Sequence, residues 1–240
     1  QWYQAGENSN TEIAGATVAS YTASGLGAGT YQYYCAVTCD SYTVKSETVT
    51  VTVKPTQLTP TITGTPSKTY DDTTGVASGQ LSITLTGVLA GDTVTATASY
   101  AYDNANAGEG KTITASGITL EGGSKDNYTL SSTTATITGT ITKSQPTIAF
   151  ADGYNPSKTY DGQTISNPTA DDLTITGAAF GNVDFTWYAG NVDEANKLAN
   201  PPKDAGTYTL TANIKETPNT AAASTSPLTL TINKATLTAT

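Results

Sequence analysis

Hydrophobic and polar residues alternate one for one along most of the chain. Because successive side chains of a strand point to opposite faces of a sheet, this alternation predicts half-buried antiparallel strands. The intervening stretches hold turn-forming sequences such as Ala90-Gly91-Asp92 and Asn200-Pro201-Pro202. No stretch keeps a helical period over about twelve residues, so the sequence predicts an all-β fold. The alternation is clearest at 46–53, 81–86, 93–100, 134–142, 173–176, 208–214 and 228–233.

Internal repeats divide the chain into modules of about ninety residues, the size of one seven-strand β-sandwich. PSKTYDDTT at 66–74 returns as PSKTYDGQT at 156–164. A strand that ends in Lys recurs at Lys54, Lys143 and Lys234. We therefore predict tandem immunoglobulin-like β-sandwich domains in an elongated array. The expected parts are a partial domain at 1–54, whole domains at 55–143 and 144–234, and the first strand of a further repeat at 235–240.

A second pair of repeats explains why the first module is short. WYQAG and AGTY in the first module return as WYAG and AGTY in the third, in the same order and before a Lys-terminated strand. About forty residues precede Trp187 in its module, whereas a single residue precedes Trp2. We therefore expect the first domain to lack about three strands.

The repeated order of Trp and Tyr resembles that of immunoglobulin domains. In that fold a Trp on the third strand packs in the core, and a Tyr that opens the sixth strand forms the tyrosine corner. The resemblance implies that Trp2 and Trp187 are core anchors. It likewise assigns Tyr31 and Tyr208 to the corner, although Gly27 replaces the Asp of the usual D-x-G-x-Y pattern. The alternative use of these aromatic side chains is to stack on sugar rings.

The second module resembles the YDG repeats of bacterial surface adhesins. The resemblance rests on SKTYDDTT at 67–74, on the string from LTGVLAGDT to ITLEG at 85–122, and on NYTLSSTTATITGTITK at 127–143. The third module's SKTYDG opening and AGTYTLTANI close are similar to the related MBG repeats of the same proteins. This resemblance, over nearly all of 55–234, implies a spacer or stalk in a long extracellular protein.

The sequence Lys-Thr-Tyr-Asp is the best-repeated motif of the second and third modules. We expect Tyr70 and Tyr160 to fill the end of each sandwich. Asp71 and Asp161 are expected to cap a turn by accepting hydrogen bonds from backbone N–H groups. Asp72 stands where the family's name has Gly, and Asp tolerates the positive φ of such a turn better than most residues.

The same motif supplies two alternatives to a structural turn. Its carboxylates, together with Asp72, could serve as oxygen ligands for Ca²⁺ between domains, although no spacing demands it. Lys68, Lys158 and Asn233 are candidates for an intramolecular isopeptide bond of the kind found in some surface-fibre domains. Asn127 fits an N-glycosylation pattern, but its NYTL sequence also belongs to the YDG-like string.

Cys35 and Cys39 lie on the strand that follows Tyr31. Four residues of extended strand span about 13 Å, whereas the Cα atoms of a disulfide lie within about 7 Å. A bond between these residues therefore needs a turn or bulge; otherwise Cys35 pairs with strands missing from the sequence. Similar bacterial immunoglobulin-like domains place two Cys here, which favours a local Cys35–Cys39 disulfide of structural importance in a secreted protein.

Composition narrows the function further. The 240 residues contain no His, Met or Arg, and 11 Lys stand against 20 acidic residues for a net charge of −9. Without His the commonest general base is missing, and without clustered basic residues nucleic-acid binding is not expected. The sequence contains no run of about eighteen apolar residues, so no membrane span is expected. Because no Met is present, we expect an interior excerpt of a longer protein.

These observations predict a non-catalytic stalk or spacer segment of a bacterial cell-surface adhesin or extracellular fibre. Its expected partners are neighbouring repeats of the same chain or fibre, with host or bacterial surface glycans or proteins as further candidates. The competing hypothesis is a carbohydrate- or protein-binding module that uses strand-end loops such as 183–204, the least regular stretch. Apart from Ca²⁺, no cofactor is expected.

Overall fold

The computed structural model describes residues 1–7, 9–177 and 181–237. Within them the regular structure consists of strands and three short 3₁₀ turns, which are η1 (Lys125–Asn127), η2 (Ala170–Asp172) and η3 (Glu194–Asn196). The predicted all-β class is therefore confirmed. No helix in this described part of the chain is long and apolar enough to cross a membrane.

Contacts between Cα atoms divide the chain into two compact units. One unit holds Gln1–Gly64, Gly79–Tyr100 and Thr114–Ile137, and the other holds Thr65–Ser78, Ala101–Ile113 and Thr138–Thr240. The predicted domain boundaries stay predictions. Residues 1–54, 55–143 and 144–234 are the first, second and third segments of the chain.

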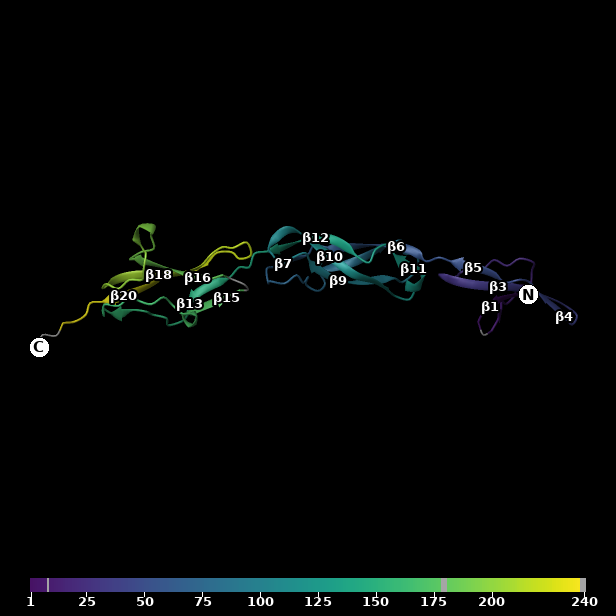
Figure 1. Cartoon of the computed structure of the whole chain (residues 1–240), viewed down its shortest axis with the longest axis horizontal. Helices are drawn as coiled ribbons and strands as arrows, with labels where there is room; N and C mark the ends of the chain where they lie inside the picture. The colour runs from purple at the N-terminus through teal and green to yellow at the C-terminus, as the bar shows by residue number, and fades with distance from the viewer. Residues whose placement is uncertain (8, 178–180, 238–240) are drawn as a thin grey trace. The chain divides into compact units, whose positions relative to one another are not determined.

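The first segment forms a single sheet within its described residues (Figure 1). Its core residues are Tyr33, Tyr34 and Ala36, all on β3. Val37 and Tyr42 remain largely exposed because no second sheet of the described segment faces them. The strand order is β2 (Thr11–Glu12), β1 (Trp2–Ala5), β3 (Gly29–Cys39) and β4 (Tyr42–Lys45), and β5 (Val49–Val53) also pairs with β3.

The second segment forms two sheets, and its strand alternation follows the sequence pattern. Along β8 the side chains alternate between half-buried and exposed, because Leu and Ile alternate with Ser and Thr. Leu58 in one sheet and Ile113 and Ile141 in the other are almost fully buried. One sheet has the order β7 (Ser67–Thr69), β12 (Ala135–Thr142), β10 (Gly108–Glu121) and β9 (Thr95–Tyr102); the other has β11 (Tyr128–Leu130), β6 (Thr56–Gly64) and β8 (Leu81–Thr86).

The third segment combines a two-stranded sheet with a larger one. Trp187, Leu210 and Leu230 form the centre of its core, and Phe150 and Phe185 pack against them. The small sheet pairs β13 (Thr147–Phe150) with β15 (Leu173–Thr176). The larger has the order β14 (Lys158–Thr159), β20 (Leu228–Asn233), β18 (Gly206–Ile214), β16 (Val183–Ala189) and β17 (Lys197–Leu198), with β19 (Ala223–Ser224) also on β18.

The strand predicted at 235–240 lies partly outside the described residues. β20 ends at Asn233, and residues 235–237 belong to no strand. Residues 238–240 fall outside the description, so the opening of a further repeat stays a prediction.

The core of the third segment can be tested by the same substitution at a buried and at an exposed leucine. Leu210 is fully buried and Leu237 is 96% exposed, so Leu→Ala removes the same atoms from opposite environments. We expect Leu210→Ala to lower the free energy of unfolding of this segment by about 2–5 kcal/mol, and Leu237→Ala to change it by less than about 0.5 kcal/mol. Urea unfolding followed by the fluorescence of Trp187, in a Trp2→Phe background, measures both. Equal effects of the two substitutions would contradict the assigned core.

Candidate functional site

In the second segment the Lys-Thr-Tyr-Asp motif folds into a turn around a lysine ammonium group. The Lys68 Nζ atom lies 2.7 Å from Asp71 Oδ1, and it also donates to the Thr73 carbonyl oxygen at 2.7 Å. Asp71 Oδ1 in turn accepts from the Thr73 backbone N–H at 2.9 Å. The Tyr70 N–H donates to the Thr142 carbonyl, which fixes the turn to the end of β12. The motif therefore satisfies its own charges.

The third segment repeats this arrangement about ninety residues later. Lys158 Nζ lies 2.7 Å from Asp161 Oδ1 and donates to the Gln163 carbonyl at 2.9 Å. The Gln163 N–H donates to Asp161 Oδ1, and the Tyr160 N–H donates to the Asn233 carbonyl. Among the described residues, Lys158 Nζ bonds to these oxygens and not to the Asn233 side chain.

The two turns share their backbone conformation although they differ in sequence. Asp72 adopts a φ of 62° and Gly162 a φ of 76°, both in the left-handed region. Asp tolerates this region better than most residues, and the Asp72 carboxylate also accepts a hydrogen bond from the Tyr70 hydroxyl at 3.0 Å. The replacement of Gly by Asp at position 72 thus preserves the turn.

Ion pairs and hydrogen bonds within the turns lower the pKa of the aspartate in each of them. The hydrogen bond from Lys68, aided by those from Thr73, lowers the pKa of Asp71 to about 2. The hydrogen bond from Lys158 likewise lowers the pKa of Asp161. Both carboxylates are therefore ionised and already paired. Among the described residues, no three His, Cys, Asp or Glu side chains lie close enough together to hold a metal ion, and Ca²⁺ binding by these carboxylates stays a prediction.

The two motif tyrosines differ in exposure. Tyr70 is half-buried, whereas Tyr160 is 42% exposed and does not fill the end of the sandwich as expected. Both tyrosines directly follow a short strand, but the Tyr70 hydroxyl donates to the Asp72 carboxylate, whereas Gly162 offers Tyr160 no side chain at the equivalent position. The hydrogen bond to Asp72 raises the pKa of Tyr70, and a hydrogen bond with the Asn219 side chain opposes this rise.

The tyrosines assigned to the corner bond back to the chain four residues upstream. The Tyr31 hydroxyl donates to the Gly27 carbonyl at 3.0 Å, and the Tyr208 hydroxyl donates to the Asp204 carbonyl at 2.9 Å. A hydroxyl-to-backbone bond a few residues upstream is the geometry of a tyrosine corner. Each of these tyrosines therefore fixes the orientation of the peptide group that precedes the Ala of an Ala-Gly pair.

The two tryptophans lie in different environments. Trp187 is 3% exposed, and its Nε1–H donates to Asn167 Oδ1 at 2.8 Å, so the core surrounds it and no face is left for a sugar ring. Trp2 is only half-buried and donates from Nε1 to the Val18 carbonyl at 3.0 Å. Its ring lies 6.1 Å from that of Tyr21. Because the described first segment has one sheet, Trp2 has no opposing layer to bury it.

The local disulfide expected between Cys35 and Cys39 is not formed. Both cysteines are free, with Cys35 half-buried and Cys39 exposed. They lie on one uninterrupted strand, β3, and the turn follows Cys39 instead of separating the two residues. The extended chain therefore holds their Cα atoms about 13 Å apart, beyond the reach of a disulfide.

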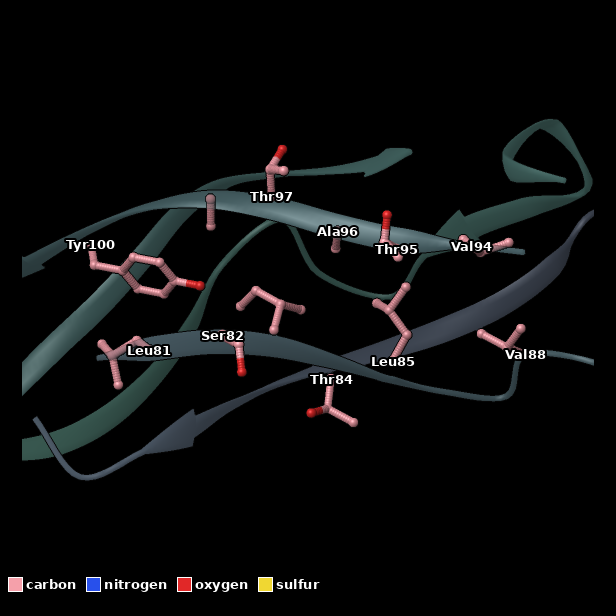
Figure 2. Close-up of a pocket in the computed structure, with 12 residues that line it drawn as sticks. Leu81, Ser82, Thr84, Leu85, Val88, Val94, Thr95, Ala96, Thr97 and Tyr100 are labelled. Carbon is pink, nitrogen blue, oxygen red and sulfur yellow. The ribbon is translucent and has the colours of Figure 1, made fainter. Parts of the chain in front are cut away.

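A groove of about 650 Å³ lies between β8 and β9 of the second segment. Figure 2 shows Leu85 and Tyr100 pointing into the space between the strands, whereas Thr84 and Thr97 point away from it. Each of these strands is the last one of its sheet, so the groove is an open edge between the sheets. Burial raises the pKa of Tyr100, in keeping with its position among the apolar side chains of the groove.

Sequence reasoning missed two asparagines whose side chains bond to the preceding segment. Asn127 accepts a hydrogen bond from the Ala28 N–H at 2.7 Å, and Asn219 accepts one from the Ala107 N–H at 2.9 Å. In the sequence, Asn127 was singled out as part of an N-glycosylation pattern and not as a contact residue. The available signal was the receiving loop, because an Ala-Gly pair whose Gly opens a strand occurs in all three segments, at β3, β10 and β18.

Comparison with known proteins identifies one family. Residues 52–136 match the family described as the YDG domain, which confirms the resemblance for most of the second segment. No match was found among curated proteins. Among solved structures, "Crystal structure of Drosophila N-cadherin EC1-4" is similar at 11% sequence identity and a TM-score of 0.23. That similarity covers 86% of this chain and 58% of the cadherin chain, so this chain spans little more than half of it.

The ion pair of the second segment generates a prediction about pH. Lys68→Met removes the hydrogen bond that lowers the pKa of Asp71, so this pKa should rise from about 2 toward its ordinary value of 3.8. Because the pKa is lower in the folded state, the pair stabilises the fold above about pH 4, and this stabilisation is lost as the pH falls toward 2. The loss is below about 1 kcal/mol, since Asp71 is 49% exposed. Titration of the carboxyl carbon by NMR measures the pKa, and Lys197→Met should leave it unchanged.

The tyrosine corner of the third segment generates a second prediction. Tyr208→Phe removes the hydrogen bond to the Asp204 carbonyl and should lower the free energy of unfolding by about 0.5–1.5 kcal/mol. Tyr160→Phe serves as the control, because Tyr160 is exposed at the end of its strand. Urea unfolding compares the two. If both variants unfold at the same urea concentration as the original chain, the corner bond contributes nothing.

Proposed function

We propose that this chain is a non-catalytic stalk or spacer segment of an extracellular adhesion protein on a bacterial surface. The match of residues 52–136 to the YDG domain supports this proposal, since repeats of that kind resemble those of bacterial surface adhesins. The repeated Lys-Thr-Tyr-Asp turns also support it. Their charged groups bond to one another and hold the ends of strands, which is the work of a scaffold.

The bonding at the junction after Lys143 is the observation that carries the proposal. The Ser144 N–H donates to the Asn219 carbonyl, and the Ala221 N–H donates to the Ser144 carbonyl, both at 2.9 Å. Lys143 forms an ion pair with Glu216. Ser144, immediately after the Lys, is thus already paired within the third segment, which leaves almost no free linker. A short bonded junction transmits force between repeats, as a stalk requires.

The surface chemistry of the chain fits this role. A net charge of −9 with Thr as the commonest outward-facing residue keeps neighbouring chains apart and the strands hydrated. Neighbouring repeats of the same chain or fibre are the partners that such a segment needs.

A protein-binding module is the second candidate, and the groove between β8 and β9 is the observation that favours it. Each strand lies at the edge of its sheet within the described residues, and β9 is bridged on that edge only near its end, where Ala101 pairs with Gly75; an added strand from a partner could bond along the rest. The half-buried apolar residues of the groove would lose their remaining solvent exposure when such a strand binds. In the stretch 183–204, the alternative from the sequence, Val183 and Phe185 of β16 help to line a second groove, of about 540 Å³.

Small-angle X-ray scattering tests the stalk. A compact chain of 240 residues has a radius of gyration of about 18 Å, and we expect a value well above this for repeats joined end to end. A short Gly-Ser insertion between Lys143 and Ser144 is the matched control, because it releases the bonded junction and should broaden the distribution of distances. A value near 18 Å would contradict the stalk, and an unaltered distribution after the insertion would show that the junction does not limit bending.

A further inference from the structure

At two junctions an asparagine side chain binds the Ala-Gly loop of the preceding segment. Asn127 Oδ1 accepts from the Ala28 N–H at 2.7 Å. Asn219 Oδ1 accepts from the Ala107 N–H at 2.9 Å, and Asn219 Nδ2 donates to Asn106 Oδ1 at 3.0 Å. The second junction is therefore held by a pair of hydrogen bonds from one side chain.

Both asparagines occupy the same place in the topology. The residue after each one pairs in parallel with the first residues of its own segment, Tyr128 with Thr56 and Thr220 with Ser144. Since these partners follow the Lys that ends the preceding segment by one or two residues, each asparagine is held next to the junction. The shared position indicates one junction design used twice.

The third segment carries the same receiving loop at its own end. Asp204-Ala205-Gly206 aligns with Asn106-Ala107-Gly108 and, through the following Thr-Tyr, with Gly27-Ala28-Gly29. Ala28 and Ala107 are half-buried, whereas Ala205 is exposed.

The peptide group before Ala205 is already oriented to donate. Its carbonyl, that of Asp204, accepts from Tyr208, as the carbonyl before Ala28 accepts from Tyr31. A peptide whose carbonyl is hydrogen-bonded is a better N–H donor. Among the described residues, no acceptor bonds to the Ala205 N–H.

We propose that the Asp204-Ala205-Gly206 loop is a docking surface for a further β-sandwich repeat, whose junction asparagine accepts from the Ala205 N–H and donates to the Asp204 carboxylate. This inference rests on the proposed function and adds the contact by which repeats join. The Asp204 carboxylate replaces the Asn106 amide as the acceptor, and a charged acceptor forms the stronger hydrogen bond.

Lys234 and Tyr160 add to the similarity between the loop at Ala205 and the loop at Ala107, which Asn219 binds. Lys234 ends the third segment as Lys143 ends the second, and Lys143 pairs with Glu216 of the following segment. Tyr160 is 42% exposed, whereas its counterpart Tyr70 is half-buried beside Asn219. A docked repeat with an acidic residue near its asparagine would cover both.

The residue before the Ala of each loop determines whether the loop accepts an asparagine placed like Asn127 or one placed like Asn219. A Cβ atom added at Gly27 would lie 2.5 Å from Asn127 Oδ1, so a side chain there excludes an asparagine placed like Asn127. This explains why Gly27 departs from the Asp of the D-x-G-x-Y pattern. Asp204 and Asn106 both carry a Cβ atom, so the third loop fits an asparagine placed like Asn219.

Amide hydrogen exchange, followed by NMR on the full chain, tests the proposal. In the chain as it stands, the Ala28 and Ala107 amides should exchange slowly and the Ala205 amide at least about tenfold faster, because only the first two are bonded. In an extended chain, residues 235–240 are replaced by a second copy of 144–234. The Ala205 amide should then exchange at least about tenfold more slowly than before.

The controls use the same extended chain. Asn219→Ala in the added copy should return the Ala205 amide to fast exchange. Asp204→Ala leaves the added copy intact and should reduce the protection of the Ala205 amide. An added copy of 55–143, which carries Asn127, should protect Ala205 only in an Asp204→Gly background. Fast exchange of Ala205 in every extended chain would overturn the docking surface. That result would leave scattering of the original chain, and hence the stalk, unaffected.

Discussion

Most strands of this protein bury one face, because Thr occupies the other; β18 is an exception, since Thr209 and Thr211 are buried beside Leu210 and Ala212. The cores are consequently built from aliphatic and aromatic side chains on the inner faces, such as Leu58 and Ile113 in the second segment and Leu210 in the third. Segments of about ninety residues have small cores, which limits how much hydrophobic burial can stabilise them. The ends of the strands must therefore be held by hydrogen bonds and ion pairs.

The polar chemistry of the chain is directed to those ends. In both Lys-Thr-Tyr-Asp turns the ammonium group is enclosed by a carboxylate and a backbone carbonyl, and the carboxylate caps a backbone N–H. The tyrosine corners fix a peptide group in the same manner. Residues that would suggest a binding or catalytic site in another protein thus have structural partners here. This internal pairing supports the proposed scaffold role.

The junctions apply the same chemistry between segments. A single asparagine side chain bonds to the backbone of the preceding segment while its own segment holds it in place. Backbone N–H groups are present in every sequence, so this contact places little demand on the surface of the preceding repeat. It does constrain the residue before the Ala, where Gly27 leaves the space that Asn127 fills and Asn106 offers a second hydrogen bond.

The sequence by itself determined the all-β class and the YDG resemblance, because side-chain alternation and turn residues are local properties. It also located the motif turns, whose partners lie within five residues of one another. Only the tertiary structure decided the exposure of Trp2 and Tyr160, the separation of Cys35 and Cys39 along β3, and the role of the junction asparagines. These depend on strand ends and on partners about a hundred residues away, which no local pattern specifies.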